Sequence, residues 1–223
     1  TSNRLETVDV IVALTDTAGS IVARGTVPVT VDANGRSRSR QRLYVRSPRL
    51  WSAENPTLYS AAVELTVAGA TIDVASAFFG IRTLQVDPVH GLRVNGEVVK
   101  LRGACVHHDN GILGAATFAD AEERRVRLLK DAGFNAIRSS HNPMSVAMLE
   151  ACDRLGVYVM DETFDMWTSN KMPHDYSLRF SEWWERDVES MVSKDFNHPS
   201  VIMYSIGNEI PETGSPAGGL TGR

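Results

Sequence analysis

The first third of the chain alternates apolar and polar residues over short segments. Val8, Val10, Val12 and Leu14 stand at every second position before a turn over residues 16–19. A period of two is typical of strands with one buried face. Further strands are predicted at residues 21–23, 26–31, 42–45, 59–67 and 71–79, with Gly-, Asn- or Pro-containing turns between them. Many short strands of this kind indicate a small β-sandwich.

The pattern changes near residue 84. A hairpin is predicted over residues 92–101 with Asn95-Gly96 as its turn, and after it strands and helices alternate. We expect strands at 99–106, 134–138, 157–161 and 201–206, and helices at 120–132, 144–155 and 182–196. The third strand is apolar throughout, as in a parallel sheet covered on both faces. We therefore divide the chain into residues 1–84 and 85–223.

Four βα steps make half of an eight-stranded barrel or most of a smaller doubly wound sheet. No Gly-x-Gly-x-x-Gly motif follows the first strand, which disfavours a dinucleotide-binding sheet. Three local details are also predicted. Asp120 and Glu123 form a capping box. Trp183 and Trp184 pack in the core from their helix. Cys105 and Cys152, both in apolar segments, are buried free thiols.

Composition and charge narrow the function classes. Hydrophobic residues make up 43% of the chain and charged residues 22%, which is typical of a globular protein. The net charge is -4 and the basic residues are scattered, so neither nucleic acid nor an anionic membrane is an expected partner. No apolar run approaches the roughly 18 residues of a membrane span. The start at Thr1 resembles an internal position of a longer protein, so the compartment stays unknown.

Polar side chains follow each predicted strand of the second region, where chemistry concentrates in parallel α/β architectures. Their mixture of carboxylates, imidazoles, an arginine and an amide suits a sugar, whose hydroxyls need paired donors and acceptors. Trp167, in a long loop after the third strand, is expected to stack on a sugar face. The residues after the four strands are His107, His108 and Asp109; Arg138, His141 and Asn142; Asp161 and Glu162; and Gly207, Asn208 and Glu209.

Each of these residues also has a structural interpretation. Glu209 could cap a helix, His107 and His141 could be structural histidines, and Arg138 could neutralise carboxylates across a barrel mouth. One of the pair at 161 and 162 could be a buried hydrogen-bond organiser. The ligand types present have no His-Glu-x-x-His or comparable spacing, so we expect neither a catalytic metal nor another cofactor.

Four blocks together resemble glycoside hydrolase family 2. They are Asn-Gly-Glu-Val-Val-Lys-Leu-Arg-Gly at 95–103 with His107, Asn-Ala-Ile-Arg-Ser-Ser-His-Asn-Pro at 135–143, Asp161-Glu162, and His-Pro-Ser-Val-Ile-Met-Tyr-Ser-Ile-Gly-Asn-Glu at 198–209. The resemblance covers nearly the whole chain. It implies an immunoglobulin-like β-sandwich followed by the N-terminal half of a (β/α)8 TIM barrel.

The resemblance also implies a retaining mechanism with two carboxylates about 5–5.5 Å apart. By motif, Glu209 would be the general acid and then the base, and Asn208 would hold the sugar 2-hydroxyl. Substrate contacts are expected from His107, Arg138, His141, Asp161, Glu162 and Trp167. The family's nucleophile belongs after the seventh barrel strand, which places it beyond Arg223, so the chain alone is expected to be inactive.

Some features depart from the family pattern. Residues 1–223 contain neither the family's usual jelly-roll domain nor the Glu-Thr-His that supplies magnesium ligands in some relatives. His141-Asn142-Pro143 and Tyr204 stand where tyrosine and tryptophan are frequent. The substrate is expected to be a terminal β-galactoside, with β-glucuronidase or β-mannosidase activity as alternatives. A non-catalytic carbohydrate-binding or structural role, and assembly into a homo-oligomer, are also kept open.

Overall fold

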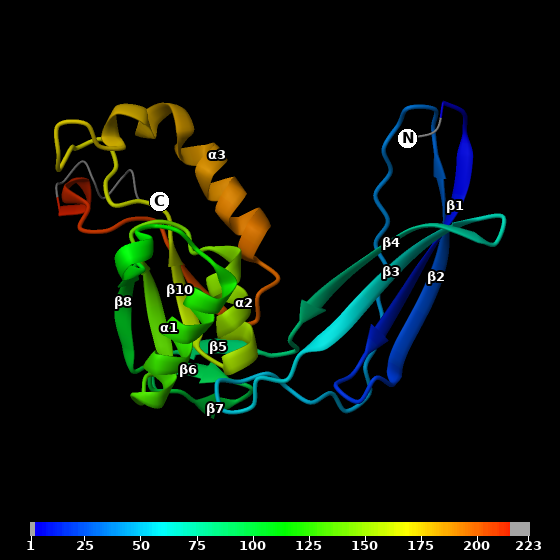
Figure 1. Ribbon diagram of the computed structural model, residues 1–223, viewed down its shortest axis with the longest axis horizontal. Helices are drawn as coiled ribbons and strands as arrows, with labels where there is room; N and C mark the ends of the chain where they lie inside the picture. Colours follow the sequence, from blue (N-terminus) through cyan, green and yellow to red (C-terminus); the bar gives the residue numbers. More distant parts are fainter. Residues whose placement is uncertain (1–2, 215–223) are drawn as a thin grey trace. The chain divides into compact units, whose positions relative to one another are not determined.

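The chain divides into two compact units in a computed structural model that describes residues 3–214 (Figure 1). One unit contains the described residues up to Trp51 together with Thr57–Ile81. The other contains Ser52–Pro56 and the described residues from Arg82 onward. The short segment Ser52–Pro56 is held to the second unit by hydrogen bonds, since Lys130 Nζ donates to the Ala53 carbonyl at 2.6 Å.

The first unit contains a four-stranded antiparallel sheet in the order β2-β1-β3-β4. Its strands are β1 (Glu6–Thr15), β2 (Ile21–Val31), β3 (Tyr59–Val67) and β4 (Ala70–Phe79). The β1–β2 turn is closed by Asp16, whose Oδ1 accepts hydrogen bonds from the backbone N–H groups of Ala18 and Ser20. The two strands predicted at 21–23 and 26–31 are one continuous strand, because no turn interrupts the ladder with β1.

The strand predicted at residues 42–45 is wrong, since no ladder joins this segment to the sheet among the described residues. Its side chains nevertheless alternate between partly buried and exposed. A Cβ on Gly25 would lie 2.7 Å from Gln41 Oε1 and 2.8 Å from Leu43 Cδ2, so both side chains lie against β2. The segment covers the sheet as a second layer through its side chains, with Gln41 Nε2 donating to the Val10 carbonyl.

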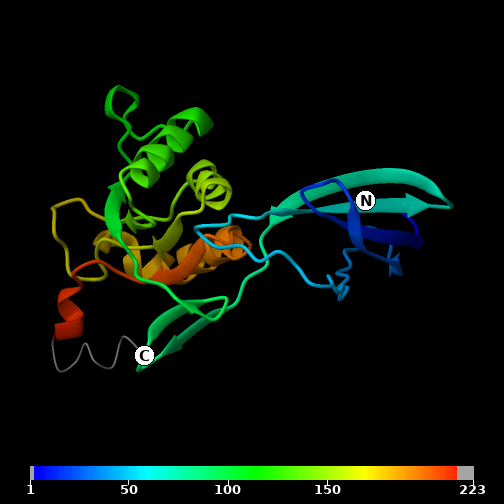
Figure 2. The same ribbon diagram turned by 90° about the horizontal axis from the view of Figure 1, so that it is seen from below.

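The second unit begins with a small antiparallel sheet of β5 (Leu84–Asp87), β6 (Gly91–Val94) and β7 (Glu97–Val98). Figure 2 shows these strands apart from the larger sheet of the same unit. The predicted Asn-Gly turn is confirmed between β6 and β7. Asn95 has φ +55° and Gly96 has φ +87°, the left-handed pair that a two-residue hairpin turn requires.

The larger sheet is parallel and has the order β11-β10-β9-β8, as the alternating pattern predicts. Each connection between successive strands carries a helix, which is the βα repeat of a barrel. The strands are β8 (Gly103–His107), β9 (Ala136–Ser140), β10 (Tyr158–Glu162) and β11 (Val201–Ser205), and the helices are α1 (Ala119–Asp131), α2 (Val146–Leu155) and α3 (Ser177–Asp195). Short 3₁₀ turns lie at Gly111–Leu113 and Pro211–Gly214.

The core of the second unit lies between this sheet and its helices α1 and α2 (Figure 1). Alternate strand residues such as Val106, Ile137 and Val159 face the helices. Cys152 on α2 is fully buried, as predicted. Cys105 is exposed, which corrects the prediction, because it precedes Val106 by one position and so points to the opposite face of β8. Both thiols are free.

Two helix predictions also need correction. Helix α1 has Phe118 at its N-cap with no side-chain hydrogen bond, so Asp120 and Glu123 form no capping box. Helix α3 begins at Ser177 and not at residue 182. Its buried side chains are Met191 and Asp195, whereas Trp183 and Trp184 are 37% and 46% exposed. Both indoles are therefore only partly buried, which corrects the prediction that they pack in the core.

Candidate active site

The carboxylate of Glu162, the last residue of β10, organises the rim at the carboxyl ends of the parallel strands. It is fully buried. Its Oε2 accepts from Arg138 Nε at 3.1 Å, Arg138 Nη2 at 2.8 Å and Ser205 Oγ at 2.6 Å. Its Oε1 lies 2.7 Å from His141 Nδ1. A buried carboxylate is costly unless it is paired and hydrogen-bonded, and here β9, β11 and the β9–α2 loop all supply partners.

Asp161 lies on the other face of β10. Adjacent residues of a strand point to opposite sides, so Asp161 faces the helix layer, while Glu162 faces the rim. Its Oδ1 accepts from Ser139 Oγ at 3.2 Å and from the Met144 backbone N–H at 2.9 Å. Its side chain is fully buried. Glu162 is equally buried, so burial does not separate the two carboxylates, and a substrate contact by either residue stays a prediction.

The two histidines of the rim lie together. The rings of His107, at the end of β8, and His141 are perpendicular, with centroids 5.3 Å apart. Arg138 on β9 is partly exposed, with 30% of its side chain accessible, and its Nη2 also donates to Asn208 Oδ1 at 2.9 Å. The structure therefore brings together predicted site residues from the ends of all four parallel strands. The hydrogen bonds and ring contacts that join them cannot be read from the sequence pattern.

Glu209 and Asn208 follow β11 on this rim. Asn208 is nearly buried, and its Nδ2 donates to Asp165 Oδ1 at 2.9 Å while its Oδ1 accepts from Arg138. Glu209 is different, since 82% of its side chain is exposed and its backbone has φ +48°. The amide is fixed from two sides, whereas the carboxylate beside it is exposed.

Two residues of the site were missed by the residue-by-residue predictions. Asp165 and Lys171 lie in the loop between β10 and α3, and Lys171 Nζ donates to Asp165 Oδ1 at 2.9 Å. Burial alone would raise the pKa of Asp165, but the hydrogen bonds from Asn208 and Lys171 hold that pKa below its usual value. The unusual length of this loop was the sequence signal that could have found them.

Trp167 lies in the same loop and is mostly buried. Its ring stacks on Phe180 with centroids 6.0 Å apart, and its Nε1–H donates to the Ile206 carbonyl at 2.8 Å. The first contact packs the loop against α3, and the second joins it to the segment that leads to Glu209. Stacking of Trp167 on a sugar stays a prediction.

The remaining rim residues make local contacts. His108 Nε2 lies 3.1 Å from the Pro143 carbonyl oxygen, and Asp109 Oδ1 accepts from the Gly111 N–H at 3.0 Å. Among residues 3–214, no group of three or more His, Cys, Asp or Glu side chains is arranged to hold a metal ion. No helix of this part of the chain is long and apolar enough to cross a membrane.

Comparison with known protein families identifies the family of the chain that carries this rim. Residues 87–218 match the family model described as "Glycosyl hydrolases family 2, TIM barrel domain", and residues 1–82 match "Glycosyl hydrolases family 2". The chain belongs to glycosyl hydrolase family 2. The resemblance, the β-sandwich and the partial barrel inferred from the sequence are confirmed by these two matches.

Individual relatives in family 2 carry different names. Beta-galactosidase BoGH2A of Bacteroides ovatus is 42% identical over 216 residues, which cover 97% of this chain and 25% of that protein. A family 2 member from Bacteroides cellulosilyticus superposes with a TM-score of 0.91 at 44% identity, covering 96% of this chain and 28% of that one. The Bacteroides uniformis beta-glucuronidase structure gives a TM-score of 0.81 at 27% identity, over 94% and 25% of the two chains. The chain thus spans about a quarter of the length of these relatives.

Proposed function

We propose that Glu209 is the acid-base residue of a retaining β-glycosidase to which this chain contributes the sandwich and the first barrel strands. The observation that carries the proposal is the difference between two neighbouring side chains in the turn after β11. The Glu209 carboxylate is open, whereas its neighbour Asn208 is locked between Arg138 and Asp165. An open carboxylate can reach a glycosidic oxygen, and a fixed amide can hold a sugar hydroxyl in a defined place.

In this proposal Glu209 first donates its proton to the leaving oxygen, while a second carboxylate attacks the anomeric carbon. The glycosidic bond breaks and a glycosyl-enzyme forms. Glu209, now a carboxylate, then removes a proton from water, which attacks the anomeric carbon and releases the sugar. The nucleophile is proposed to come from outside residues 1–223. Glu162 and Asp165, the carboxylates nearest in the network, are already engaged by Arg138 and Lys171.

His107, Arg138 and His141 are proposed to line the sugar subsite, with Asn208 on the 2-hydroxyl. Glu162 supports this subsite from beneath, because it is buried and holds Arg138 and His141 in place. The fixed ring and guanidinium positions would lower the entropy that is lost when a sugar binds.

The substrate is proposed to be a terminal β-galactoside. The Bacteroides ovatus relative that is described as a β-galactosidase supports this, at 42% identity. The alternative is a β-glucuronide, which the Bacteroides uniformis structure supports at 27% identity. A panel of nitrophenyl β-galactoside, β-glucuronide and β-mannoside with the full-length enzyme decides between them, and preferential turnover of a uronide or mannoside would overturn the galactoside proposal.

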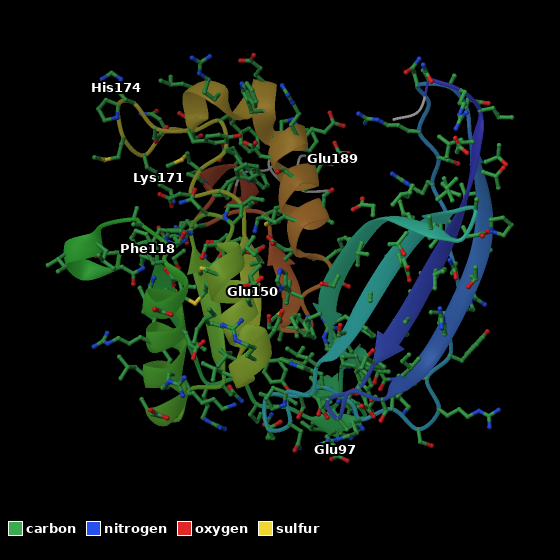
Figure 3. The ribbon with its side chains drawn as sticks, turned by 45° about the vertical axis from the view of Figure 1, so that its right-hand side comes forward. Glu97, Phe118, Glu150, Lys171, His174 and Glu189 are labelled. Atoms are coloured by element: carbon green, nitrogen blue, oxygen red, sulfur yellow. The ribbon has the colours of Figure 1, made fainter. Side chains whose placement is uncertain are left out.

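The acid-base role is tested by Glu209→Gln in the full-length enzyme. Turnover of substrates with poor leaving groups should fall about 10²- to 10⁴-fold, because they need the proton. Activated aryl glycosides, whose leaving groups depart with little protonic help, should lose less in the glycosylation step. Glu150→Gln is the matched control, since Glu150 is exposed on α2, as Figure 3 shows. Equal losses on both substrate types would contradict the role.

A further inference from the structure

The loop between β10 and α3 contacts the turn that carries Glu209. The Asn208 N–H donates to the Phe164 carbonyl at 2.9 Å, and Trp167 Nε1 donates to the Ile206 carbonyl. Further along, Glu212 Oε1 accepts from the backbone N–H groups of Thr168 and Ser169 at 3.0 and 2.7 Å. The loop therefore contacts the turn before, at and after the glutamate.

Lys171, labelled in Figure 3, is a charged residue of this loop whose ammonium group contacts the turn directly. Its ammonium group has three N–H donors. One donates to Asp165 Oδ1 and one to the Asn208 carbonyl, each at 2.9 Å. Nζ also lies 3.9 Å from Glu209 Oε2, close enough for an ion pair with the carboxylate form. One side chain thus connects the loop, the backbone immediately before Glu209 and the Glu209 carboxylate.

Glu209 needs such support because its own geometry is unfavourable. Its φ of +48° lies in the left-handed region, which non-glycine residues seldom adopt. Such conformations persist where surrounding contacts hold them. Among residues 3–214, 82% of the Glu209 side chain is exposed, so the contacts to Asn208 and Lys171 are the ones that bear on its orientation there.

We propose that Lys171 is a positioning residue that holds the Glu209 carboxylate in place for the second, water-activating half of the reaction. This rests on the proposed acid-base role of Glu209. The attraction of an ammonium group to a carboxylate exists only while Glu209 is ionised, which is its state after it has given its proton to the leaving group. Lys171 would therefore contribute most to the hydrolysis of the glycosyl-enzyme, the step in which Glu209 takes a proton from water.

The test compares Lys171→Met, Lys171→Arg and Lys100→Met in the full-length enzyme. Lys100 is exposed and is the chemically matched control. The substrate is a dinitrophenyl glycoside of the sugar that the enzyme turns over, so that the first step needs no acid and hydrolysis of the glycosyl-enzyme limits kcat. Sodium azide is the probe, because azide attacks the anomeric carbon without having to lose a proton.

For Lys171→Met we expect kcat to fall about 10²-fold, the size of loss that misplacement of a catalytic group produces. Azide should restore most of the rate and yield the glycosyl azide. Lys171→Arg keeps the charge and should lose less. Lys100→Met should behave as wild type. Since a merely structural loss removes active enzyme, azide would not repair it.

Two results would overturn the inference: a kcat for Lys171→Met that matches Lys100→Met, or a loss that azide leaves unchanged. Should Lys171→Met fail to fold, the test uses Lys171→Arg. Its smaller loss of kcat must also be restored by azide if the inference is right. Glu209→Gln in the same assay separates the two proposals. If azide restores Glu209→Gln but not the Lys171 variants, only the positioning role is wrong. If azide fails with Glu209→Gln, the acid-base assignment itself is wrong.

Discussion

Asp161 is expected to make this protein less stable as the pH rises toward neutrality. Its carboxyl group is fully buried beneath the rim, next to the equally buried Asp195. Burial, and after it the neighbouring Asp195 carboxylate, raises the pKa of Asp161 from 3.8 to about 7. The Met144 N–H and the charge of Lys194 oppose this shift without cancelling it.

The sign follows from proton binding. Because the folded-state pKa lies above the unfolded value, the folded protein holds the proton more tightly between pH 4 and pH 7. The stabilisation is complete below the unfolded pKa and is lost as the pH rises through about 7. A shift from 3.8 to about 7 corresponds to roughly 4 kcal/mol in total. About 2–3 kcal/mol of this should disappear between about pH 5 and pH 7.5.

Asp161→Asn removes the titrating group and keeps its shape and an oxygen for Ser139 Oγ and the Met144 N–H. The difference in the free energy of unfolding between the variant and wild type should grow in favour of the variant by about 2–3 kcal/mol between about pH 5 and pH 7.5. Urea unfolding at both pH values measures this. Tryptophan fluorescence suits the second unit, which contains Trp167, Trp183 and Trp184 of the chain's 4 tryptophans. Asp131→Asn, at an exposed position of α1, is the control.

Other ionisable groups also contribute to the wild-type curve, so the decisive quantity is the difference between Asp161→Asn and wild type. A difference that is the same at both pH values would refute the reasoning. It would mean that Asp161 stays ionised, with Lys194 and the hydrogen bonds outweighing burial and Asp195.

Two further substitutions test the packing of the site and of the second unit. Arg138→Met should lower the free energy of unfolding by about 3 kcal/mol, because it leaves the buried Glu162 carboxylate without its cation, and urea unfolding with Arg138→Lys for comparison checks this. Gly156→Ala should cost more than Gly133→Ala: both glycines have positive φ, but a Cβ at 156 would lie 2.3 Å from the Ala53 carbonyl oxygen, whereas nothing lies within 4 Å at 133. We expect about 1–2 kcal/mol for the backbone conformation at either site and an additional loss only at 156. Equal thermal unfolding midpoints for the two alanine variants would contradict this. They would show that the backbone at Ala53 moves away from the added methyl group without loss of stability.

The sequence by itself determined the order of strands and helices in the parallel sheet, and with it the rim. A period of two predicts the strands of the first unit, and the alternation of apolar strands with amphipathic helices predicts the parallel sheet. Because parallel strands end at one edge, His107, Arg138, Glu162 and Glu209 had to gather there once the strands were identified. Local hydrophobic pattern is sufficient for these conclusions, since each element must bury its own apolar face.

The tertiary structure decided what each polar side chain touches. Which residue of the pair Asp161 and Glu162 faces the rim depends on the pleat of β10, and no composition rule reveals it. The loop residues Asp165 and Lys171 meet Asn208 across 43 and 37 positions of sequence. Such contacts arise only after the sheet has brought distant loops together, so their partners are fixed by the fold and not by the residues beside them in the chain.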